Sequence, residues 1–222
     1  MTTTTVHVLL YDGFDELDAV GPYEVFATAA ALGAAFDVRL VTVAADEDET
    51  DRTVRADRAE PTVSASHGLR VVAGDTLPGP DADDAPDLLV VPGGGWNDRS
   101  AAGAWAEYER GVVPDAVAAH HEAGATVAAV CTGGMLLAKA GLLDGRPAVT
   151  HAGAMDDLRG TAADVRADAR VVDAGSVLTA GGITSGLDLA LHLVEREVGA
   201  DLANRVATEL EYERHGVVHE SE

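Results

Sequence analysis

The sequence predicts an α/β domain in which a mostly parallel, doubly wound sheet carries helices on both faces. Short apolar runs alternate with helical patterns along the whole chain, which is typical of this class. The 222 residues suffice for one large domain, and a hydrophobic fraction of 47% excludes a disordered acidic chain. No internal repeat or linker interrupts the alternation. We therefore expect residues 1–222 to form a single domain.

The expected elements of the first half follow from their composition and their boundaries. Val6–Tyr11 is a strand-like run, and a turn sequence follows it directly. Residues 20–32 predict a helix, because Pro22 lies near its start, where proline is tolerated, and Gly33 offers a cap. Two further strands are expected at 38–43 and 88–91. A strand at 88–91 would lead directly into a glycine-rich loop.

The second half continues the same alternation. Expected strands lie at 125–130, 147–149, 171–172 and 176–179, and expected helices at 105–123, 135–141, 184–198 and 202–212. The segment 45–60 breaks the pattern, because it is crowded with Asp, Glu, Thr and Arg and has few apolar anchors. It predicts an acidic surface insertion that forms a solvated loop, with an acidic binding arm as the lesser alternative.

The charge balance is strongly acidic. Asp and Glu total 38 against 15 Lys and Arg, which gives a formal net charge of −23, and Lys139 is the single lysine. Such a surface repels nucleic acid and anionic membranes, since both need a basic footprint. It also repels itself at low salt, and salt screens that repulsion. We therefore expect a protein from a high-salt cytoplasm that binds neither nucleic acid nor membrane.

Other classes are disfavoured by simpler observations. A single cysteine excludes an internal disulfide framework. The chain shows no secretory leader and no apolar stretch of membrane-spanning length, so we expect a soluble cytoplasmic protein. His120 and His121 precede Glu122, but adjacent helix residues do not share a face, and no second ligand cluster lies nearby. We expect no metal and no cofactor.

Cys131 is the most informative residue. It follows the expected strand 125–130 at once, and Thr132, Gly133 and Gly134 lead into the next helix. A tight strand-to-helix turn presents a nucleophile over the end of a sheet. A helix N-terminus also favours negative charge, so we expect a lowered thiol pKa here. The alternative is a free cysteine that packs as a small hydrophobe.

A cysteine nucleophile needs donors for developing charge and a proton partner. The loop 92–95 offers backbone N–H groups, and the N–H of Thr132 is a natural second donor; alternatively, the glycines only form a turn. Asp15, Glu16 and Asp18 follow the first strand, and a half-buried carboxyl there would have a raised pKa. From the residues alone, a helix N-cap is the better explanation of Asp18. His151 follows the strand 147–149 and is a candidate for the same edge.

Several motifs resemble the ThiJ/PfpI superfamily when taken together. They are Leu17-Asp18-x-x-Gly21-Pro22, Val91-Pro92-Gly93-Gly94, Val130-Cys131-Thr132-Gly133, Gly141–His151 and Thr179–Asp188, in order along nearly the whole chain. The resemblance implies the class I glutamine-amidotransferase-like, flavodoxin-like fold, usually as a homodimer. The branch it resembles most contains isonitrile hydratases and the ligand domains of AraC-type regulators.

The resemblance also implies roles for individual residues. It places the nucleophile on Cys131, the acidic partner on Asp18, and backbone oxyanion donors on Gly94 and Thr132. This implied role replaces the N-cap explanation of Asp18. The Thr132 hydroxyl is expected to orient the Asp18 carboxyl. Gly95, Gly133 and His151 are expected to line the site. The implied reaction is hydration of a small molecule through a Cys131 thioimidate, with no cofactor.

Departures from the family pattern narrow the function. Thr132 stands where peptidase-like members have histidine, and no His-x-Glu follows Cys131, so proteolysis and amidotransfer are disfavoured. The sequence ends at Glu222, so we expect no DNA-binding region like that of the regulators. Ala152 replaces a tryptophan common in hydratase-like members, which leaves the substrate open. The alternatives are a redox-sensing or stress-protective protein, glyoxalase-like or chaperone-like, and a ligand-binding regulator acting through a partner.

Overall fold

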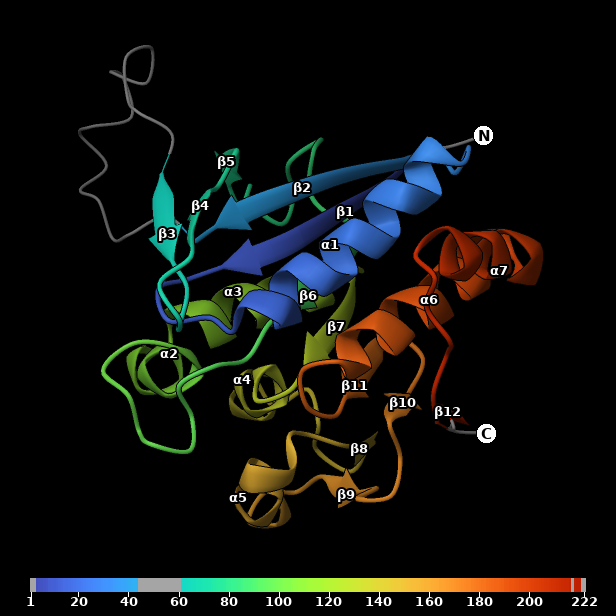
Figure 1. The fold of residues 1–222 in the computed structure, drawn as a ribbon. Coiled ribbons are helices and arrows are strands. Elements are labelled where there is room, and N and C mark those ends of the chain that lie inside the picture. Colours follow the sequence, from blue (N-terminus) through green and yellow to red (C-terminus); the bar gives the residue numbers. More distant parts are fainter. Residues whose placement is uncertain (1–2, 44–60, 217, 221–222) are drawn as a thin grey trace.

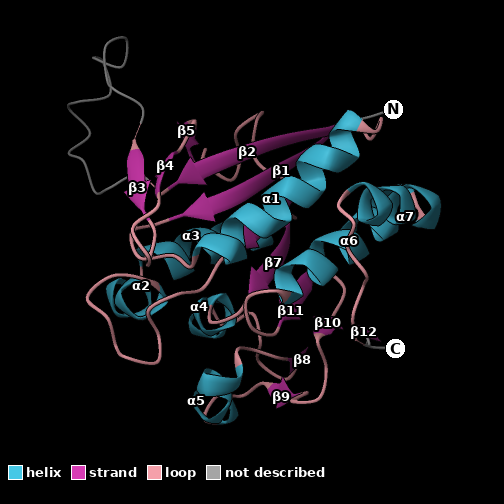
Figure 2. Cartoon of the chain, viewed as in Figure 1, coloured by secondary structure: helices cyan, strands magenta, loops and turns pink. Residues whose placement is uncertain are grey.

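The computed structural model describes residues 3–43, 61–216 and 218–220 and centres on one eight-stranded sheet (Figures 1 and 2). In spatial order its strands are β12 (Val218–Glu220), β10 (Val171–Asp173), β11 (Val177–Ala180), β7 (Thr126–Val130), β6 (Leu88–Val91), β1 (Thr4–Leu10), β2 (Phe36–Thr42) and β5 (Asp75–Thr76). Every neighbouring pair is parallel except β10 with β11. The prediction of a mostly parallel sheet is confirmed.

Helices cover both faces of this sheet, as predicted (Figure 1). One face carries α1 (Glu16–Ala31), α6 (Ser185–Val198) and α7 (Ala200–Glu209), and the other carries α2 (Ala104–Arg110), α3 (Val112–Glu122) and α4 (Gly133–Lys139). Smaller elements lie outside these layers: the hairpin β3 (Thr62–Ser64) and β4 (Arg70–Val72), the pair β8 (Pro147–Ala148) and β9 (Asp164–Val165), a 3₁₀ turn (Ala152–Ala154) and α5 (Met155–Arg159).

The central strands are buried on both faces, which explains their unbroken apolar runs. All four residues of β6 are buried, as are the last five of β1 and the last four of β7. These strands are parallel neighbours, so their carboxyl ends meet at one edge of the sheet. The turns that follow them, near residues 11–15, 92–97 and 131–132, are thereby brought together, where open α/β sheets bind ligands.

Element boundaries differ from the expected ones where local capping decides them. Helix α1 begins at Glu16 because the Asp15 side chain accepts a hydrogen bond from the Leu17 N–H at 3.2 Å, so Pro22 lies inside the helix. The helix expected at 105–123 is two helices, divided at Gly111, whose φ is +82°. The last helix ends at Glu209 and a further strand, β12, follows it.

Two other expectations concern the acidic segment and the absence of membrane-spanning helices. The acidic segment 45–60 lies wholly outside the described residues, which resume at residue 61. Within the described ranges, no helix is long and apolar enough to cross a membrane.

Candidate active site

Cys131 sits at a strained strand-to-helix turn between β7 and α4. Its φ is +57°, a conformation that non-glycine residues rarely adopt. The turn is held by hydrogen bonds, because the Cys131 N–H donates to the carbonyls of Ala180 and Gly181 at 3.1 and 2.9 Å. The Thr150 hydroxyl donates to the Cys131 carbonyl at 2.8 Å. The surrounding fold therefore fixes the backbone that carries the thiol, as the motif predicted.

Close approach of two loops explains the glycines around this turn. A Cβ on Gly133 would lie 2.3 Å from the Val91 carbonyl oxygen, and a Cβ on Gly93 would lie 2.5 Å from the Thr132 nitrogen. Any side chain at either position would push the loop after β6 away from the Cys131 turn. Gly133 therefore lies beneath the site and does not line the pocket, contrary to the expectation for it.

Asp18 projects from α1 into the protein interior beside Cys131. Its side chain is completely buried, and its Oδ2 accepts a hydrogen bond from the Gly93 N–H at 3.0 Å. The other oxygen, Oδ1, is buried and accepts no hydrogen bond of ordinary geometry from the described residues. Burial, and next the charge of Asp15, raise the pKa of Asp18 to about 7. The residue is thus a buried carboxyl that can hold or release a proton near neutral pH.

The Cys131 thiol does not have the lowered pKa that its place at a helix start predicts. Burial, followed by the charge of Asp18, raises the pKa of Cys131 to about 12, while the N–H groups of Ile183 and Thr132 act in the opposite direction. The thiol is 6% exposed and α4 has only seven residues, so loss of solvation outweighs the helix dipole. The prediction of a lowered pKa was wrong.

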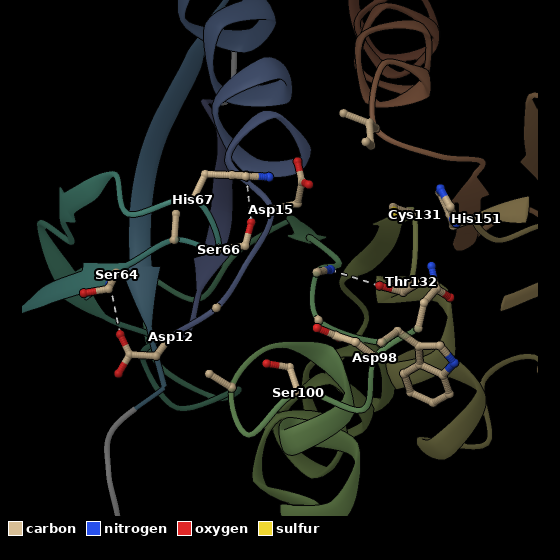
Figure 3. Close-up of a pocket in the computed structure, with 18 residues that line it drawn as sticks. Asp12, Asp15, Ser64, Ser66, His67, Asp98, Ser100, Cys131, Thr132 and His151 are labelled. Atoms are coloured by element: carbon tan, nitrogen blue, oxygen red, sulfur yellow. Dashed lines mark hydrogen bonds between the residues drawn. The ribbon is translucent and has the colours of Figure 1, made fainter. Parts of the chain in front are cut away.

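Gly94 and Thr132 are paired with each other. The Gly94 N–H donates to the Thr132 hydroxyl oxygen at 2.9 Å (Figure 3), so it is not a free donor. Among the described residues, the Asp18 carboxylate accepts from the Gly93 N–H and makes no hydrogen bond with the Thr132 hydroxyl. Both expectations are thereby corrected. The backbone donors that favour a negative sulfur are instead Thr132 and Ile183.

Sequence reasoning missed Ile183. Its φ is +41°, an outlier for a β-branched residue, and its side chain is 38% exposed at the pocket. The preceding Gly181-Gly182 pair signals a tight loop, but no sequence rule places a β-branched residue in the left-handed region.

A pocket of about 590 Å³ opens above Cys131 (Figure 3). Its wall is formed by residues from six separate segments of the chain: Asp12, Gly13, Asp15, Ser64–His67, Gly94–Asp98, Ser100, Ala102, Cys131, Thr132, His151 and Ile183. Figure 3 shows Cys131, Thr132 and His151 on one side, facing Asp12, Ser64 and His67 across the opening. The expected positions of Gly94, Gly95 and His151 at this edge agree with the pocket wall.

His151 has a structural contact as well as a place at the pocket. Its Nδ1 accepts a hydrogen bond from the Gly153 N–H at 3.0 Å, and so caps the short 3₁₀ turn. A Cβ on Gly182 would lie 2.5 Å from His151 Cδ2, so the ring packs tightly against that loop. The ring therefore joins two loops of the wall.

The β3–β4 hairpin forms the wall opposite Cys131, although no residue of it was expected at the site. The His67 Nδ1 and Glu16 Oε2 atoms are 2.7 Å apart, and the His67 N–H donates to Glu16 Oε1 at 2.7 Å. This contact raises the pKa of His67 and lowers that of Glu16 to about 2. In the described part of the chain, Asp15, Glu16 and His67 are the group whose ligand atoms lie within 4.8 Å of one another, as a metal would require. The ion pair accounts for this cluster without a metal.

Comparisons with known proteins agree with this fold. The sequence model of the DJ-1/PfpI family matches residues 4–196. The chain is 34% identical over 206 residues to the isonitrile hydratase of Pseudomonas putida, covering 92% of this chain and 76% of that protein. A crystal structure of a ThiJ/PfpI family protein from Pseudomonas syringae has a TM-score of 0.76 at 25% identity, covering 97% of this chain and 77% of that one. Drosophila melanogaster DJ-1beta has a TM-score of 0.75 at 21% identity, over 96% and 100% of the two chains, and shares the fold. This chain belongs to the DJ-1/PfpI family.

Proposed function

We propose that this protein adds water to small isocyanides and releases N-substituted formamides, using Cys131 as the nucleophile. The observation that carries the proposal is the buried pair of Cys131 and Asp18 beneath an open pocket. A carboxyl with a pKa of about 7 is matched to proton transfer at neutral pH. Similarity to an isonitrile hydratase over most of the chain supports the choice of substrate.

The first step is addition of the thiol to the isocyanide carbon. The sulfur of Cys131 bonds to that carbon as the thiol proton passes to the Asp18 carboxylate. Asp18 then delivers the proton to the same carbon. One S–C and one C–H bond form and one S–H bond breaks, which gives a thioimidate. Because the resting thiol has a raised pKa, it needs this adjacent base.

The second step is hydrolysis of the thioimidate. Water bonds to the thioimidate carbon, with one of its protons going to the nitrogen, and gives a tetrahedral intermediate. The C–S bond then breaks, the other water proton returns to sulfur, and the formamide leaves. Asp18 relays both protons, and the N–H groups of Thr132 and Ile183 stabilise negative charge on sulfur as it departs. The Gly94–Thr132 hydrogen bond joins the loop after β6 to the turn that carries the Thr132 N–H.

Turnover of 4-nitrophenyl isocyanide in molar KCl tests the proposal. Formation of N-(4-nitrophenyl)formamide in proportion to protein concentration is expected. The alternative is a redox-sensing protein in which Cys131 oxidises to sulfenic acid. The raised pKa of Cys131 counts against that alternative, because sensor cysteines have low pKa values. Absence of formamide, with ready oxidation of Cys131 by mild peroxide, would favour it.

The pH dependence of kcat/KM follows from the role of Asp18 as a base. The ionised carboxylate is the active form, so acid removes activity and kcat/KM should rise with pH through about 7. We expect an increase of roughly tenfold per pH unit below that point and a plateau above it. Initial rates between pH 6 and 8.5, corrected for uncatalysed hydrolysis, measure it. A flat profile or a falling one would contradict this role.

A further inference from the structure

We infer that the pocket above Cys131 selects cationic and neutral substrates against anionic ones, with Asp98 as the main determinant. The inference deepens the proposed function by naming a substrate class, and it rests on that function for the reaction itself. The selection by charge rests only on the pocket wall, so it can be tested without turnover.

The pocket wall contains carboxylates and lacks strong cations. Asp12, Asp15 and Asp98 line the pocket, whereas no Lys or Arg of the described residues lines it. Of its two imidazoles, that of His67 is paired with Glu16, so any positive charge on it is neutralised. In the other, His151, the Nδ1 atom accepts a hydrogen bond from the Gly153 N–H. The remaining uncompensated charge of the wall is negative.

The nearest candidate for a compensating cation, Arg99, is held away from the pocket. Its backbone adopts a φ of +52°, and its guanidinium carbon lies 3.9 Å from the centre of the Trp105 ring. Its Nη2 also donates to Asp157 Oδ2 at 3.0 Å, an oxygen shared with the Trp96 indole N–H at 2.6 Å. Aromatic stacking and an ion pair therefore occupy Arg99, and it does not neutralise its neighbour Asp98.

Asp98 is the carboxylate best placed to act on a substrate. Oδ1 of Asp12 accepts a hydrogen bond from the Ser64 N–H at 2.9 Å, and Oδ1 of Asp15 caps α1, so both have structural tasks. Asp98 is exposed at the pocket and makes no side-chain hydrogen bond or ion pair with other described residues. Its charge is therefore available to a molecule bound in the pocket, where Figure 3 labels Asp98 among the lining residues.

The net charge of −23 is a competing source of the same selectivity, and salt separates the two. The Debye length falls from about 10 Å at 0.1 M to about 3 Å at 1 M salt, so a whole-protein field fades while a contact within the pocket persists. A local effect should also depend on Asp98 and not on an acid elsewhere.

The test uses the fact that Cys131 is the single cysteine, so thiol reagents react at this pocket alone. Rates of labelling by cationic 2-(trimethylammonium)ethyl methanethiosulfonate and anionic 2-sulfonatoethyl methanethiosulfonate are measured, each divided by its rate with a free thiol. We expect the cation to be favoured by about tenfold at 0.1 M KCl, with a preference retained at 1 M. Asp98→Asn should reduce this preference about threefold.

The matched control is Asp168→Asn, which changes the net charge equally at an exposed position outside the pocket and should leave the preference unchanged. Equal normalised rates for the two reagents in the unaltered protein would overturn the inference. So would an equal loss of preference in both variants, since that result assigns the selectivity to net charge.

A second arm connects the charge selection to catalysis. Two aryl isocyanides are compared, one with a trimethylammoniomethyl group and one with a carboxymethyl group on the ring. The ratio of their kcat/KM values is measured in the unaltered protein and in Asp98→Asn, so the intrinsic reactivities of the two substrates cancel between the proteins. The cation-to-anion ratio should again fall about threefold in the variant. If neither isocyanide turns over but the labelling preference holds, the proposed function fails and the charge selection stands. If both turn over and the ratio is unaffected, the charge selection fails.

Discussion

Cys131→Ala is expected to lose at least about 1,000-fold in the rate of formamide formation while keeping its fold. The proposed reaction splits a difficult hydration into two steps through a covalent bond to sulfur, and alanine cannot form that bond. The variant removes a single buried sulfur atom and leaves the backbone hydrogen bonds of residue 131 with Ala180, Gly181 and Thr150 in place.

The measurement for Cys131→Ala is the initial rate with 4-nitrophenyl isocyanide, beside a thermal melt that establishes folding. Asp168→Asn serves as an active control, because the residue is exposed and outside the pocket. Retention of a tenth or more of the rate (on the order of a 1 kcal/mol change in barrier) would mean that sulfur is not the nucleophile.

Asp18→Asn is expected to lower turnover by about 100-fold or more and to stabilise the protein at pH 8. The amide cannot relay protons, which accounts for the first effect. For the second, the pKa of Asp18 is about 7 in the fold against an ordinary 3.8, so the folded state binds this proton more tightly than the unfolded state. Wild-type stability therefore falls as pH rises from about 4 to about 7, and the asparagine variant lacks this loss.

Urea unfolding at pH 4.5 and pH 8 measures the predicted change in stability. The free energy of unfolding of Asp18→Asn should exceed that of the wild type by on the order of 2 kcal/mol at pH 8 and by much less at pH 4.5. Glu24→Gln is the matched control, since Glu24 lies exposed on the same helix. A variant that is active, or that is less stable than wild type at pH 8, would refute the assignment of a buried proton-relaying carboxyl to Asp18.

The sequence was sufficient to predict the sheet class, the order of the principal elements and the turn at Cys131. Each of these depends on local patterns: apolar strands, capping residues, and small residues where two loops meet. Asp18 was different, because its position before a helix fits an N-cap equally well, and only the family motif distinguished it from Asp15. In the structure, Asp15 is the residue that caps α1.

The parts of the site that could not be predicted depend on long-range packing. The thiol pKa depends on how completely the fold excludes water from Cys131, and a helix-start rule carries no information about that. The Gly94–Thr132 hydrogen bond and the Ile183 N–H arise from loops 38 and 52 residues from their partners in sequence. His67 lies in a hairpin between two strands of three residues each, and strands this short give no periodic pattern in the sequence.

The most direct test of the central claim is to block and release the single thiol while formamide production is followed. Methyl methanethiosulfonate caps Cys131 alone, and a reducing agent removes the cap. We predict that the rate of N-(4-nitrophenyl)formamide formation falls in proportion to the capped fraction, reaches zero at one cap per chain, and returns on reduction. Continued formation of formamide by the fully capped protein, or its absence from the uncapped protein, would contradict hydration through Cys131.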